Sequence, residues 1–554
     1  MQTSPRLSSG HGAGPGPGRD MAGEPAPEVL RLLQQGLRLL RQHRLLEAEI
    51  HYRQALAREP GCFEALHMMA VLRLVQENLP ASLDFVASAV AQGVTAPQKL
   101  AGLVPTLARL GDELQALGRY TESAISYEML LAIAPASPAA MAALGVALRN
   151  SGRPQEALAV TDRRIEDAAG DAQAAAEALG FRGDLLQDLG RYQDAAKSYA
   201  EALELCPDAP ALHQHYAETL HILGREDAAL AQFDEALACE TGDKARIRAA
   251  RGLVLLSLGR LREGFADCGD GSGEAAPIAS KLPRWDGASV DGTLLVRSGG
   301  ASLGEQVLYA SLIPELALKA DELVVEIAPH LARLFERSFP EVRVVSCDAS
   351  PSAGAAAEQD FATAGRFLRR SLDDFPVRDG GYLVPDPERL ADLRARLGDG
   401  RPVIGVCWQG QDAAGPAASG PALADFAPLL ASIEGRFVSL LGGETAVDRE
   451  ALMADHDLAV EQIADIDLAD DIEGLAALIA ACDVVVTGDG AVAHLAGALG
   501  RPAVVFLSYG PAGWYWFRDR MDSPWYPTVQ LRRQSAGQPW AALVAMAAQE
   551  EFDG

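Results

Sequence analysis

The sequence predicts a chain in two halves, a superhelix of paired α-helices followed by an α/β module of two doubly wound lobes. In the first half, small and aromatic residues recur at a fixed spacing, which is typical of a helical repeat array. In the second half, short apolar runs alternate with segments of helical period, which is typical of parallel sheets covered by helices. The clearest strand–turn–helix unit lies between Leu478 and Leu507, and we expect the function to depend on it.

Composition narrows the class of protein. The chain has 554 residues and a formal net charge of −28 at pH 7, which argues against a non-specific grip on nucleic acid or on an anionic membrane. No apolar run reaches the roughly 18–20 residues of a membrane span, and the 7 cysteines include no CxxC pair. Residues 1–27 are rich in Gly, Pro and Ser and lack the apolar core of a secretory signal, so we expect a disordered segment and a cytoplasmic protein.

Residues 28–268 repeat one motif. Ala195 and Tyr199 return 34 residues later as Ala229 and Phe233. Small residues let two antiparallel helices approach closely, and the aromatic ring fills the gap to the next pair. The pattern resembles the tetratricopeptide repeat and predicts about seven units.

Such an array has a concave face suited to an extended peptide. We therefore predict that the repeats capture a protein, with a pure scaffold as the alternative. The chain contains only two asparagines, Asn78 and Asn150, so it lacks the asparagine ladders with which superhelices of this type often hold a peptide backbone. Carboxylates or apolar contacts would have to hold it instead.

Residues 269–290 have the composition of a linker, and residues 291–395 are predicted to form the first α/β lobe. The turn from Ser298 to Gly304 is rich in glycine and opens a helix near Glu305. The predicted strands of this lobe are Thr293–Arg297, Leu323–Ile327 and Val342–Val345.

Residues 396–534 are predicted to form the second lobe, and residues 535–554 a C-terminal helix. Its predicted strands include Val403–Cys407 and Phe437–Leu441, with a helix near Leu475–Cys482. Ligands of doubly wound sheets bind where strand carboxyl ends meet helix N-termini. We therefore expect a cleft between the two lobes.

The stretch from Leu478 to Leu507 predicts an anion site. It contains a buried strand at Val484–Val486, a tight glycine turn and a helix over Ala491–Leu499. A strand that turns through glycine into a helix aims free backbone N–H groups and the positive helix end at one point. Asp489 and His494 are the ionisable side chains beside that point.

Five motifs occur in an informative order: PRWDG at 283–287, GEQVLYASLIPEL at 304–316, WQG at 408–410, DVVVTGDGAVAHLAGALGRP at 483–502 and SPWYP at 523–527. Together they resemble the bacterial tetratricopeptide-repeat glycosyltransferases, which are relatives of heptosyltransferases and, in architecture, of O-linked N-acetylglucosamine transferases. The resemblance implies a GT-B fold and a nucleotide-sugar donor bound mainly by the C-terminal lobe. It implies no metal and no other cofactor, because backbone N–H groups and the helix dipole would stabilise the leaving phosphate.

The resemblance also assigns site residues. The implied donor-binding residues are Gly304, Trp408, Gln409, Thr487, Gly488, Asp489, Gly490, Ala491 and His494. His494 would also act in catalysis near the phosphates or ribose, with a structural helix histidine as the alternative. For Trp408, the alternative to donor binding is a place in the hydrophobic core. The aromatic residues Trp514–Trp516 and Trp525–Tyr526 would line the cleft or pack the C-terminal segment against the lobes.

Glu305 falls where heptosyltransferase relatives carry a catalytic aspartate directly after glycine. A carboxylate at a helix start that faces the cleft deprotonates an acceptor hydroxyl. The alternative is simple charge complementarity with the helix N-terminus.

The sequence departs from the family where cations are expected. Relatives carry basic residues after the tryptophan–glycine turn and a lysine after the strand equivalent to Phe437–Leu441, whereas this chain has neither. The family's aspartate–threonine pair is Asp489-Gly490 here. The departures indicate a donor with a single phosphate or lost catalysis. Four arginines of the C-terminal segment are alternative cations: Arg518, Arg520, Arg532 and Arg533.

These features predict a protein O-glycosyltransferase that moves a sugar onto Ser or Thr of a bacterial acceptor protein held by the repeats. Flagellin is the acceptor suggested by analogy, since some relatives modify it with nonulosonic acids from a cytidine-monophosphate donor. A non-catalytic adaptor with a degenerate GT-B domain is one alternative, and a transferase for polysaccharide or lipid-linked acceptors is another. The sequence leaves the oligomeric state open, with a homodimer among the alternatives.

Overall fold

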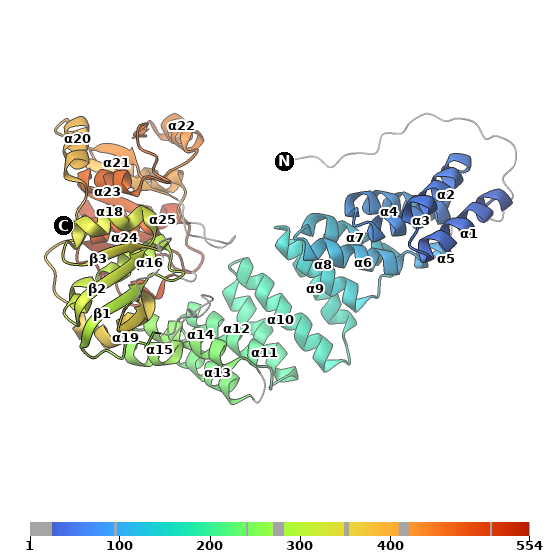
Figure 1. The fold of residues 1–554 in the computed structure, drawn as a ribbon, viewed down its shortest axis with the longest axis horizontal. Coiled ribbons are helices and arrows are strands. Elements are labelled where there is room, and N and C mark those ends of the chain that lie inside the picture. The colour runs from blue at the N-terminus through green and yellow to red at the C-terminus, as the bar shows by residue number, and fades with distance from the viewer. Residues whose placement is uncertain are drawn as a thin grey trace. The chain divides into compact units, whose positions relative to one another are not determined.

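The computed structural model describes residues 25–93, 97–239, 242–269, 282–347, 354–408, 420–509 and 512–552. The predictions for most of the N-terminal segment, for most of the linker and for Gln409 lie outside the described residues. The chain divides into two compact units, residues 1–169 and 170–554, drawn from blue to red in Figure 1. The fold class predicted from the sequence, helical repeats followed by parallel sheets, is confirmed.

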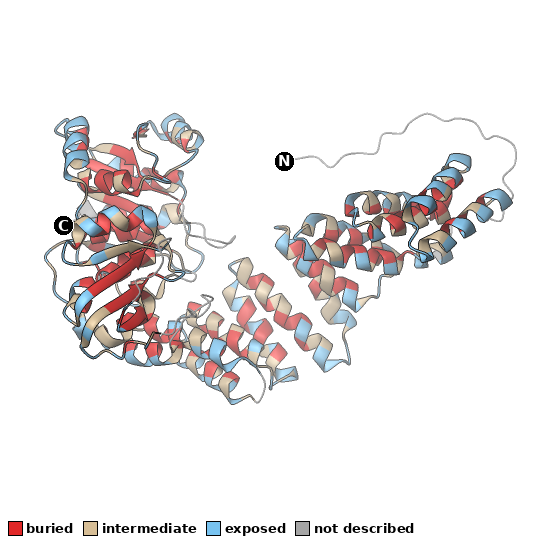
Figure 2. Ribbon diagram, viewed as in Figure 1, coloured by how far each residue is buried: buried red, intermediate tan, exposed pale blue. Residues whose placement is uncertain are grey.

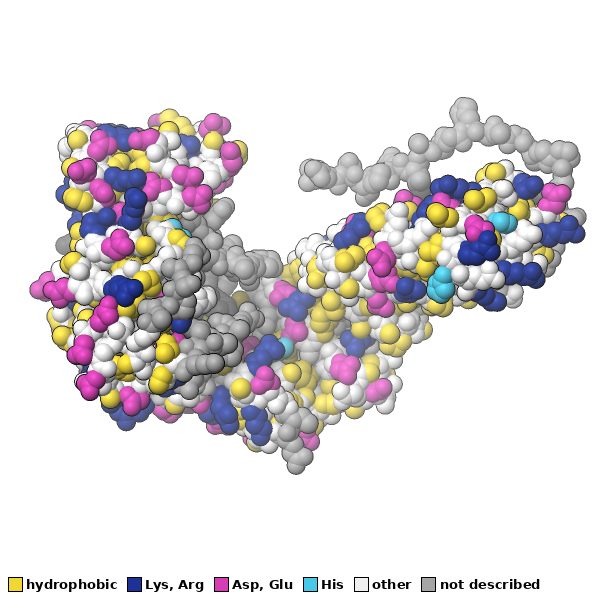
Figure 3. Space-filling view, in the orientation of Figure 1, with side chains coloured by type: hydrophobic (Ala, Val, Ile, Leu, Met, Phe, Trp, Pro, Cys, Tyr) yellow, Lys and Arg dark blue, Asp and Glu magenta, His cyan; other side chains and the backbone are white. Residues whose placement is uncertain are grey.

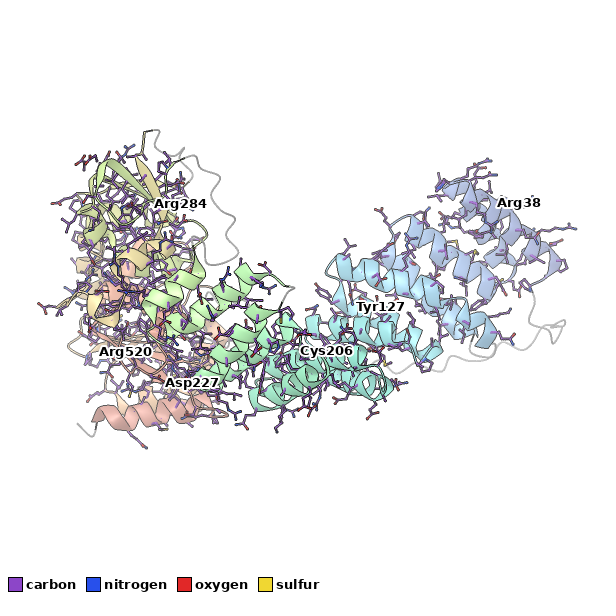
Figure 4. The ribbon with its side chains drawn as sticks, turned by 90° about the horizontal axis from the view of Figure 1, so that it is seen from below. Arg38, Tyr127, Cys206, Asp227, Arg284 and Arg520 are labelled. Carbon is purple, nitrogen blue, oxygen red and sulfur yellow. The ribbon has the colours of Figure 1, made fainter. Side chains whose placement is uncertain are left out.

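The first unit consists of antiparallel helix pairs. Its helices are α1 (Pro27–Arg41), α2 (Leu45–Arg58), α3 (Phe63–Val75), α4 (Leu79–Gly93), α5 (Pro97–Ala101), α6 (Val104–Ala116), α7 (Tyr120–Ile133), α8 (Pro138–Asn150) and α9 (Pro154–Asp167). Tyr127, labelled in Figure 4, is buried on α7 against Gly111 of α6. A Cβ on Gly111 would lie 2.6 Å from that ring, so the small residue of the motif is required by the close packing of the pair.

The second unit continues the repeats with three more helix pairs. They are α10 (Ala172–Asp188) with α11 (Tyr192–Leu205), α12 (Pro210–Ile222) with α13 (Glu226–Ala238), and α14 (Lys244–Ser257) with α15 (Leu261–Cys268). A Cβ on Gly183 would lie 2.5 Å from Tyr199, and the Tyr199 hydroxyl donates to Asp184 at 2.6 Å. The predicted pairing of small and aromatic residues therefore holds in this unit as well.

The N-terminal lobe is a parallel four-stranded sheet with the order β3-β2-β1-β4. Its strands are β1 (Val290–Arg297), β2 (Ala320–Ile327), β3 (Arg343–Ser346) and β4 (Ala357–Asp360). Its helices are α16 (Leu303–Ala310), α17 (Ile313–Ala317), α18 (Ala332–Ser338) and α19 (Phe361–Leu368), with short 3-10 helices η1 (Pro329–Leu331) and η2 (Leu372–Asp374). Figure 2 shows that the strands β1 and β2 are largely buried.

The C-terminal lobe is a parallel six-stranded sheet with the order β10-β9-β8-β5-β6-β7. Its strands are β5 (Val403–Cys407), β6 (Arg436–Ser439), β7 (Val460–Glu461), β8 (Val484–Gly488), β9 (Ala503–Leu507) and β10 (Val529–Arg533). Its helices are α20 (Pro387–Leu397), α21 (Ala427–Ser432), α22 (Ala446–His456), α23 (Ile472–Ala481), α24 (Ala491–Ala498) and α25 (Trp540–Phe552), with η3 (Leu423–Phe426) and η4 (Trp514–Trp516).

Helix α20 packs with the C-terminal lobe. It lies against α23, and Arg389 of α20 pairs with Asp471 at 2.7 Å. A boundary at residue 395, inside α20, would divide a single helix. The helix is therefore better grouped with the C-terminal lobe from its first residue.

The last repeat pair shares a hydrophobic core with both lobes. Helices α14 and α15 approach closely, since a Cβ on Gly252 would lie 2.8 Å from the carbonyl oxygen of Gly264. On α15, Phe265 packs edge-on against Trp514 with 5.8 Å between ring centroids. The same ring lies 3.0 Å from the Cβ position of Gly365 on α19. The repeats of this unit are therefore continuous with the α/β module.

The described helices include none with the length and hydropathy to cross a bilayer.

The close approach of α14 and α15 gives a stability prediction. Gly252→Ala inserts a methyl group against backbone and should destabilise this unit by about 1–3 kcal/mol. All 6 tryptophans lie between Trp285 and Trp540, so denaturant unfolding followed by tryptophan fluorescence reports on the part of the molecule that α15 contacts. Arg248→Ala on the exposed side of α14 is the control and should change stability by less than about 0.5 kcal/mol. Equal stabilities for Gly252→Ala and wild type would show that the two helices have room to separate.

Candidate functional site

The N-terminal turns of α16 and α24 meet where the two lobes join. A Cβ on Gly304 of α16 would lie 2.6 Å from Cδ2 of His494 on α24. Any residue with a Cβ would require a shift of the His494 ring or of one of the two helices. The two predicted site regions, one from each lobe, are therefore brought together.

Glu305 is held by a capping box at the start of α16. Its Oε2 accepts from the backbone N–H of Ser302 at 2.9 Å, and the Ser302 hydroxyl accepts from the N–H of Glu305 at 3.3 Å. The Glu305 side chain is partly exposed. Its Oε1 makes no hydrogen bond to another described residue. The cap therefore fixes Oε2 in place, while Oε1 is available to accept a proton.

The start of α24 has the strand–turn–helix form predicted from the sequence. Gly490 is the N-cap residue and brings no side chain to the helix end. Its φ of 154° and ψ of −174° belong to a region that is essentially restricted to glycine. The glycine that replaces the family's threonine is therefore required by the backbone of this turn.

Asp489 anchors the aromatic helix η4. Its Oδ1 accepts from the indole N–H of Trp516 at 2.7 Å, and its Oδ2 accepts from the N–H of Gly513 at 3.5 Å. Asp489 and Gly490 are partly exposed, whereas Thr487, Gly488 and Ala491 are buried. A ligand at this turn would therefore meet Asp489, Gly490 and the backbone of the first helical turn.

His494 is buried between the lobes and is 1% exposed. Its Nδ1 lies 2.9 Å from the Tyr526 hydroxyl, and its ring stacks on Trp516 at 4.9 Å between centroids. Burial lowers the pKa of His494 to about 3, so the ring is neutral near pH 7. In this arrangement His494 packs the interface between α16, α24 and the aromatic segment, and its ring has no surface open to a donor.

Trp408 follows β5 and is fully buried. Its indole N–H donates to Asp448 at 2.8 Å, which satisfies its polar atom within the lobe. The side chain therefore occupies the core, as the alternative interpretation of the sequence expected. Gln409, the next predicted donor-binding residue, lies outside the described residues.

The four arginines proposed as alternative cations occupy different places. Arg518 pairs with Glu226 of α13 at 3.0 Å, and Arg520, labelled in Figure 4, pairs with Asp522 at 2.6 Å. Arg532 donates to Gln530 at 3.1 Å. Arg520 and Arg532 are engaged in local contacts, whereas Arg518 reaches the repeat helices.

Arg533 ends β10 at the carboxyl edge of the C-terminal sheet. Burial and the neighbouring charge of Arg518 lower its pKa, while the charge of Asp489 raises it. Its Nη2 donates to the carbonyl oxygen of Phe517 at 3.1 Å. The charge of Asp489 acts on Arg533, so this arginine lies within electrostatic range of the α24 turn.

A buried charge cluster that was not predicted from the sequence lies at the carboxyl edge of the N-terminal sheet. Arg297 of β1 pairs with Glu326 of β2 at 2.8 Å and with Glu358 of β4 at 3.1 Å, and Asp360 pairs with Arg284 at 3.0 Å. Burial raises the pKa of Glu326 and of Asp360, while their arginine partners oppose the shift. The available signal was a charged residue at the end of an apolar strand, and such groups suit acid–base work.

Acidic and basic side chains are both present over the helical and the α/β parts on the face drawn in Figure 3.

Comparison with known proteins is consistent with this architecture. Tetratricopeptide repeat models match residues 33–97, 108–172 and 176–209. The model of glycosyltransferase family 9 (heptosyltransferase) matches residues 423–512, which include the α24 turn and His494. Protein FlbA of Caulobacter vibrioides (strain ATCC 19089 / CIP 103742 / CB 15) is 31% identical over 422 residues, which are 70% of this chain and 68% of FlbA. The chain belongs to the FlbA family. It is a glycosyltransferase with tetratricopeptide repeats.

Solved structures of tetratricopeptide repeat proteins are also similar to part of this FlbA relative. A structure of YrrB, described as a TPR protein with an unusual peptide-binding site, is 19% identical and covers 34% of this chain and 92% of its own, with a TM-score of 0.27. A thermophilic TPR protein of Thermus thermophilus is 28% identical and covers 30% of this chain and 87% of its own, with a TM-score of 0.25.

The burial of His494 predicts a specific pH dependence in this FlbA-family protein. The unfolded chain binds a proton on this histidine below about pH 6.5, whereas the folded protein does so only near pH 3. The neutral ring therefore makes its full contribution to the free energy of unfolding above pH 6.5. This contribution is lost as the pH falls, by about 2 kcal/mol between pH 7 and pH 5. Between pH 7 and pH 5, the free energy of unfolding of His494→Gln should therefore fall by about 2 kcal/mol less than that of wild type. Denaturant unfolding followed by tryptophan fluorescence measures the difference.

The exposed His456 of α22 provides the control, because His456→Gln should keep the pH dependence of wild type. An unchanged pH dependence in His494→Gln would show that His494 takes up its proton in the folded protein, and thus that the ring reaches solvent.

Proposed function

We propose that this protein is an O-glycosyltransferase that moves a sugar from a nucleotide-sugar donor to Ser or Thr of an acceptor protein held by the repeats. The observation that carries the proposal is the direct connection between the repeats and the carboxyl edge of the C-terminal sheet. Ligands of such sheets bind at that edge. A protein lying along the repeats would therefore be led toward the donor.

Arg518 makes this connection. Its side chain donates to the carbonyl oxygen of Ile222 at 2.7 Å and pairs with Glu226 at 3.0 Å, and its backbone N–H donates to Ser257 at 2.8 Å. It thus binds α12, the start of α13 and the end of α14. Arg533, beside the α24 turn, donates to Phe517, the residue before Arg518.

A second contact joins the repeats to the same edge. Tyr192, the first residue of α11, lies against Tyr509 in the loop that follows β9, with 6.0 Å between ring centroids. The loops between repeat helices therefore border the region where the donor would bind. This proximity favours a protein acceptor over a polysaccharide or lipid-linked one.

The proposed chemistry assigns one role to each group. Glu305 accepts the proton of the acceptor hydroxyl as its oxygen bonds to the anomeric carbon. The bond from that carbon to the donor phosphate breaks, and its electron pair leaves with the phosphate oxygen. The first turn of α24 and Arg533 stabilise that negative charge. His494 acts as a positioning residue that fixes α24 against α16.

One arginine at the α24 turn suits a donor with one phosphate, and we propose a nucleoside-monophosphate sugar. Calorimetric titration with CMP, and with UDP, ADP and GDP as comparisons, tests this choice. Binding of CMP that weakens in Arg533→Gln supports the proposal. Binding of a diphosphate in preference to CMP contradicts the choice of donor, and flat titrations with all four favour the adaptor.

Glu305→Gln separates the catalytic role of Glu305 from its structural one. Glutamine preserves the capping box but cannot act as a base, so the transfer rate should fall by about 10²–10⁴-fold with CMP affinity unchanged. Ser302→Ala is the matched control. It removes the cap, costs about 1 kcal/mol, and should leave transfer largely intact. Intact mass of an acceptor protein incubated with enzyme and donor provides the readout, with flagellin tested first. Full transfer by Glu305→Gln would show that Glu305 is not the base, and Glu326 would then be the next candidate.

The repeats of the first unit can be removed as a test of acceptor capture. Because α14 and α15 belong to the core of the lobes, the deletion should end at residue 169, the limit of the first unit. The shortened protein should bind the donor nucleotide as wild type does but should lose most acceptor modification. Undiminished modification would assign acceptor capture to residues 170–268 or to the lobes.

A further inference from the structure

A pocket of about 330 Å³ lies where the end of α16, the segment after α19 and the segment before β10 meet. Its lining residues are Ser311, Arg369, Phe375, Pro376, Val377, Arg378, Asp522, Ser523, Pro524, Trp525 and Pro527. It therefore combines side chains of the N-terminal lobe with the SPWYP motif of the C-terminal segment. None of the roles proposed above uses it.

Five residues that line the pocket each carry one buried side-chain atom without a hydrogen bond: Ser311 Oγ, Arg369 Nε, Arg378 Nη1, Ser523 Oγ and Trp525 Nε1. Ser311, Arg369, Ser523 and Trp525 are each 4% exposed or less, so these atoms lie behind the surface of the pocket. Buried polar groups in folded proteins are normally hydrogen-bonded, because an unmet donor is costly. A ligand that enters between these side chains and supplies acceptors would satisfy them.

The charge of the pocket specifies the ligand further. Arg369 is neutralised by Glu315, to which it donates at 2.9 and 2.5 Å. Asp522 at the rim is paired with Arg520 at 2.6 Å. Arg378 donates to the carbonyl oxygen of Ser311 at 2.6 Å and lies over the Tyr382 ring at 5.0 Å. It forms no ion pair with a described residue.

Arg378 therefore leaves the pocket with one uncompensated positive charge. Burial lowers its pKa, so the site favours an anion that restores the balance. The fork of an arginine matches the two oxygens of a carboxylate or a phosphate. Phe375 and Trp525 meet edge-on at 4.8 Å between centroids and form an apolar wall suited to the body of such a molecule.

We propose that this pocket binds a small metabolite through a carboxylate or phosphate group, at a site separate from the transfer site. Ser311 lies six residues beyond Glu305, so about 9 Å separate their positions along the axis of α16. Because the pocket is built from both lobes, the bound anion links α16 and the SPWYP segment. Its occupancy would stabilise the lobes against separation.

The segment after α19, which carries Arg378, also connects the pocket to α24. Four residues after Arg378, the N–H of Tyr382 donates to the carbonyl oxygen of Ala498 at 2.7 Å, and the N–H of Leu383 donates to it at 2.9 Å. The Tyr382 hydroxyl donates to the carbonyl oxygen of Val307 at 2.8 Å. A ligand on Arg378 thus acts on a segment that holds both α16 and α24.

Titration of the full-length protein tests the proposal. Inorganic phosphate and acetate are added separately at constant ionic strength, with chloride as the reference, and thermal unfolding is followed by tryptophan fluorescence. We expect a saturable rise in the unfolding temperature with at least one of the two anions, and the anion that gives it identifies the group. No saturable shift with either anion beyond that of chloride, as for a pocket filled by water alone, overturns the proposal.

Variants locate the binding. Arg378→Gln should weaken binding by about tenfold or more, and Trp525→Phe, which removes the indole N–H and leaves a smaller aromatic ring, by about fivefold. Arg370→Gln is the matched control, since Arg370 is exposed and lies outside the pocket. Should Arg378→Gln fail to fold, Trp525→Phe decides the outcome. Unchanged affinity in the folded pocket variants overturns the proposal.

A final variant separates this site from the transfer site. Arg533→Gln alters the proposed phosphate site at α24 and should leave this anion binding intact. Loss of binding in Arg533→Gln, together with its survival in Arg378→Gln, would place the anion at the transfer site and refute the separate pocket. If Glu305→Gln keeps full transfer, or if no nucleotide binds in the donor titration, the outcome of the anion titration is unaffected.

Discussion

The close contact between α16 and α24 is the constraint on which the rest of the α/β module depends. Gly304 leaves no space between its backbone and the His494 ring, so the two lobes are held at one separation. That separation places a capping-box carboxylate beside a helix start that favours negative charge. A larger residue at position 304 would have to displace the His494 ring or separate the two helices.

Aromatic packing maintains this arrangement from the C-terminal side. His494 stacks on Trp516, and Trp516 is in turn bound by Asp489 of the α24 turn. The side chain that anchors η4 therefore also flanks the proposed phosphate site. Neutral, buried imidazole suits this role, because a charged ring would be expensive in such surroundings. The geometry thus gives His494 a packing role beside the proposed phosphate site.

Sequence patterns anticipated the elements whose burial is uniform. The strand Val403–Cys407 and the turn into α24 were predicted with their observed limits or close to them, because apolar runs and glycine turns determine such elements locally. The strands β4 (Ala357–Asp360) and β10 (Val529–Arg533) were missed, because polar residues in both strands interrupt the apolar pattern.

Side-chain roles were harder to predict than elements. Burial of Trp408 and His494 depends on residues distant in sequence, and the contact of Arg518 with Ile222 spans 296 positions. The pairing of Arg297 with Glu326 and Glu358 follows from strand order, which no local pattern reveals. Glu305 was located correctly at a helix start, but its capping box became evident only from the contacts with Ser302.

Gly490 has an evolutionary consequence. Its backbone occupies a conformation in which a residue with a Cβ is strained by roughly 1–3 kcal/mol. A single codon change to threonine would therefore be penalised unless the loop around it were reshaped at the same time. The path of the main chain and the identity of its residue are therefore coupled at this turn.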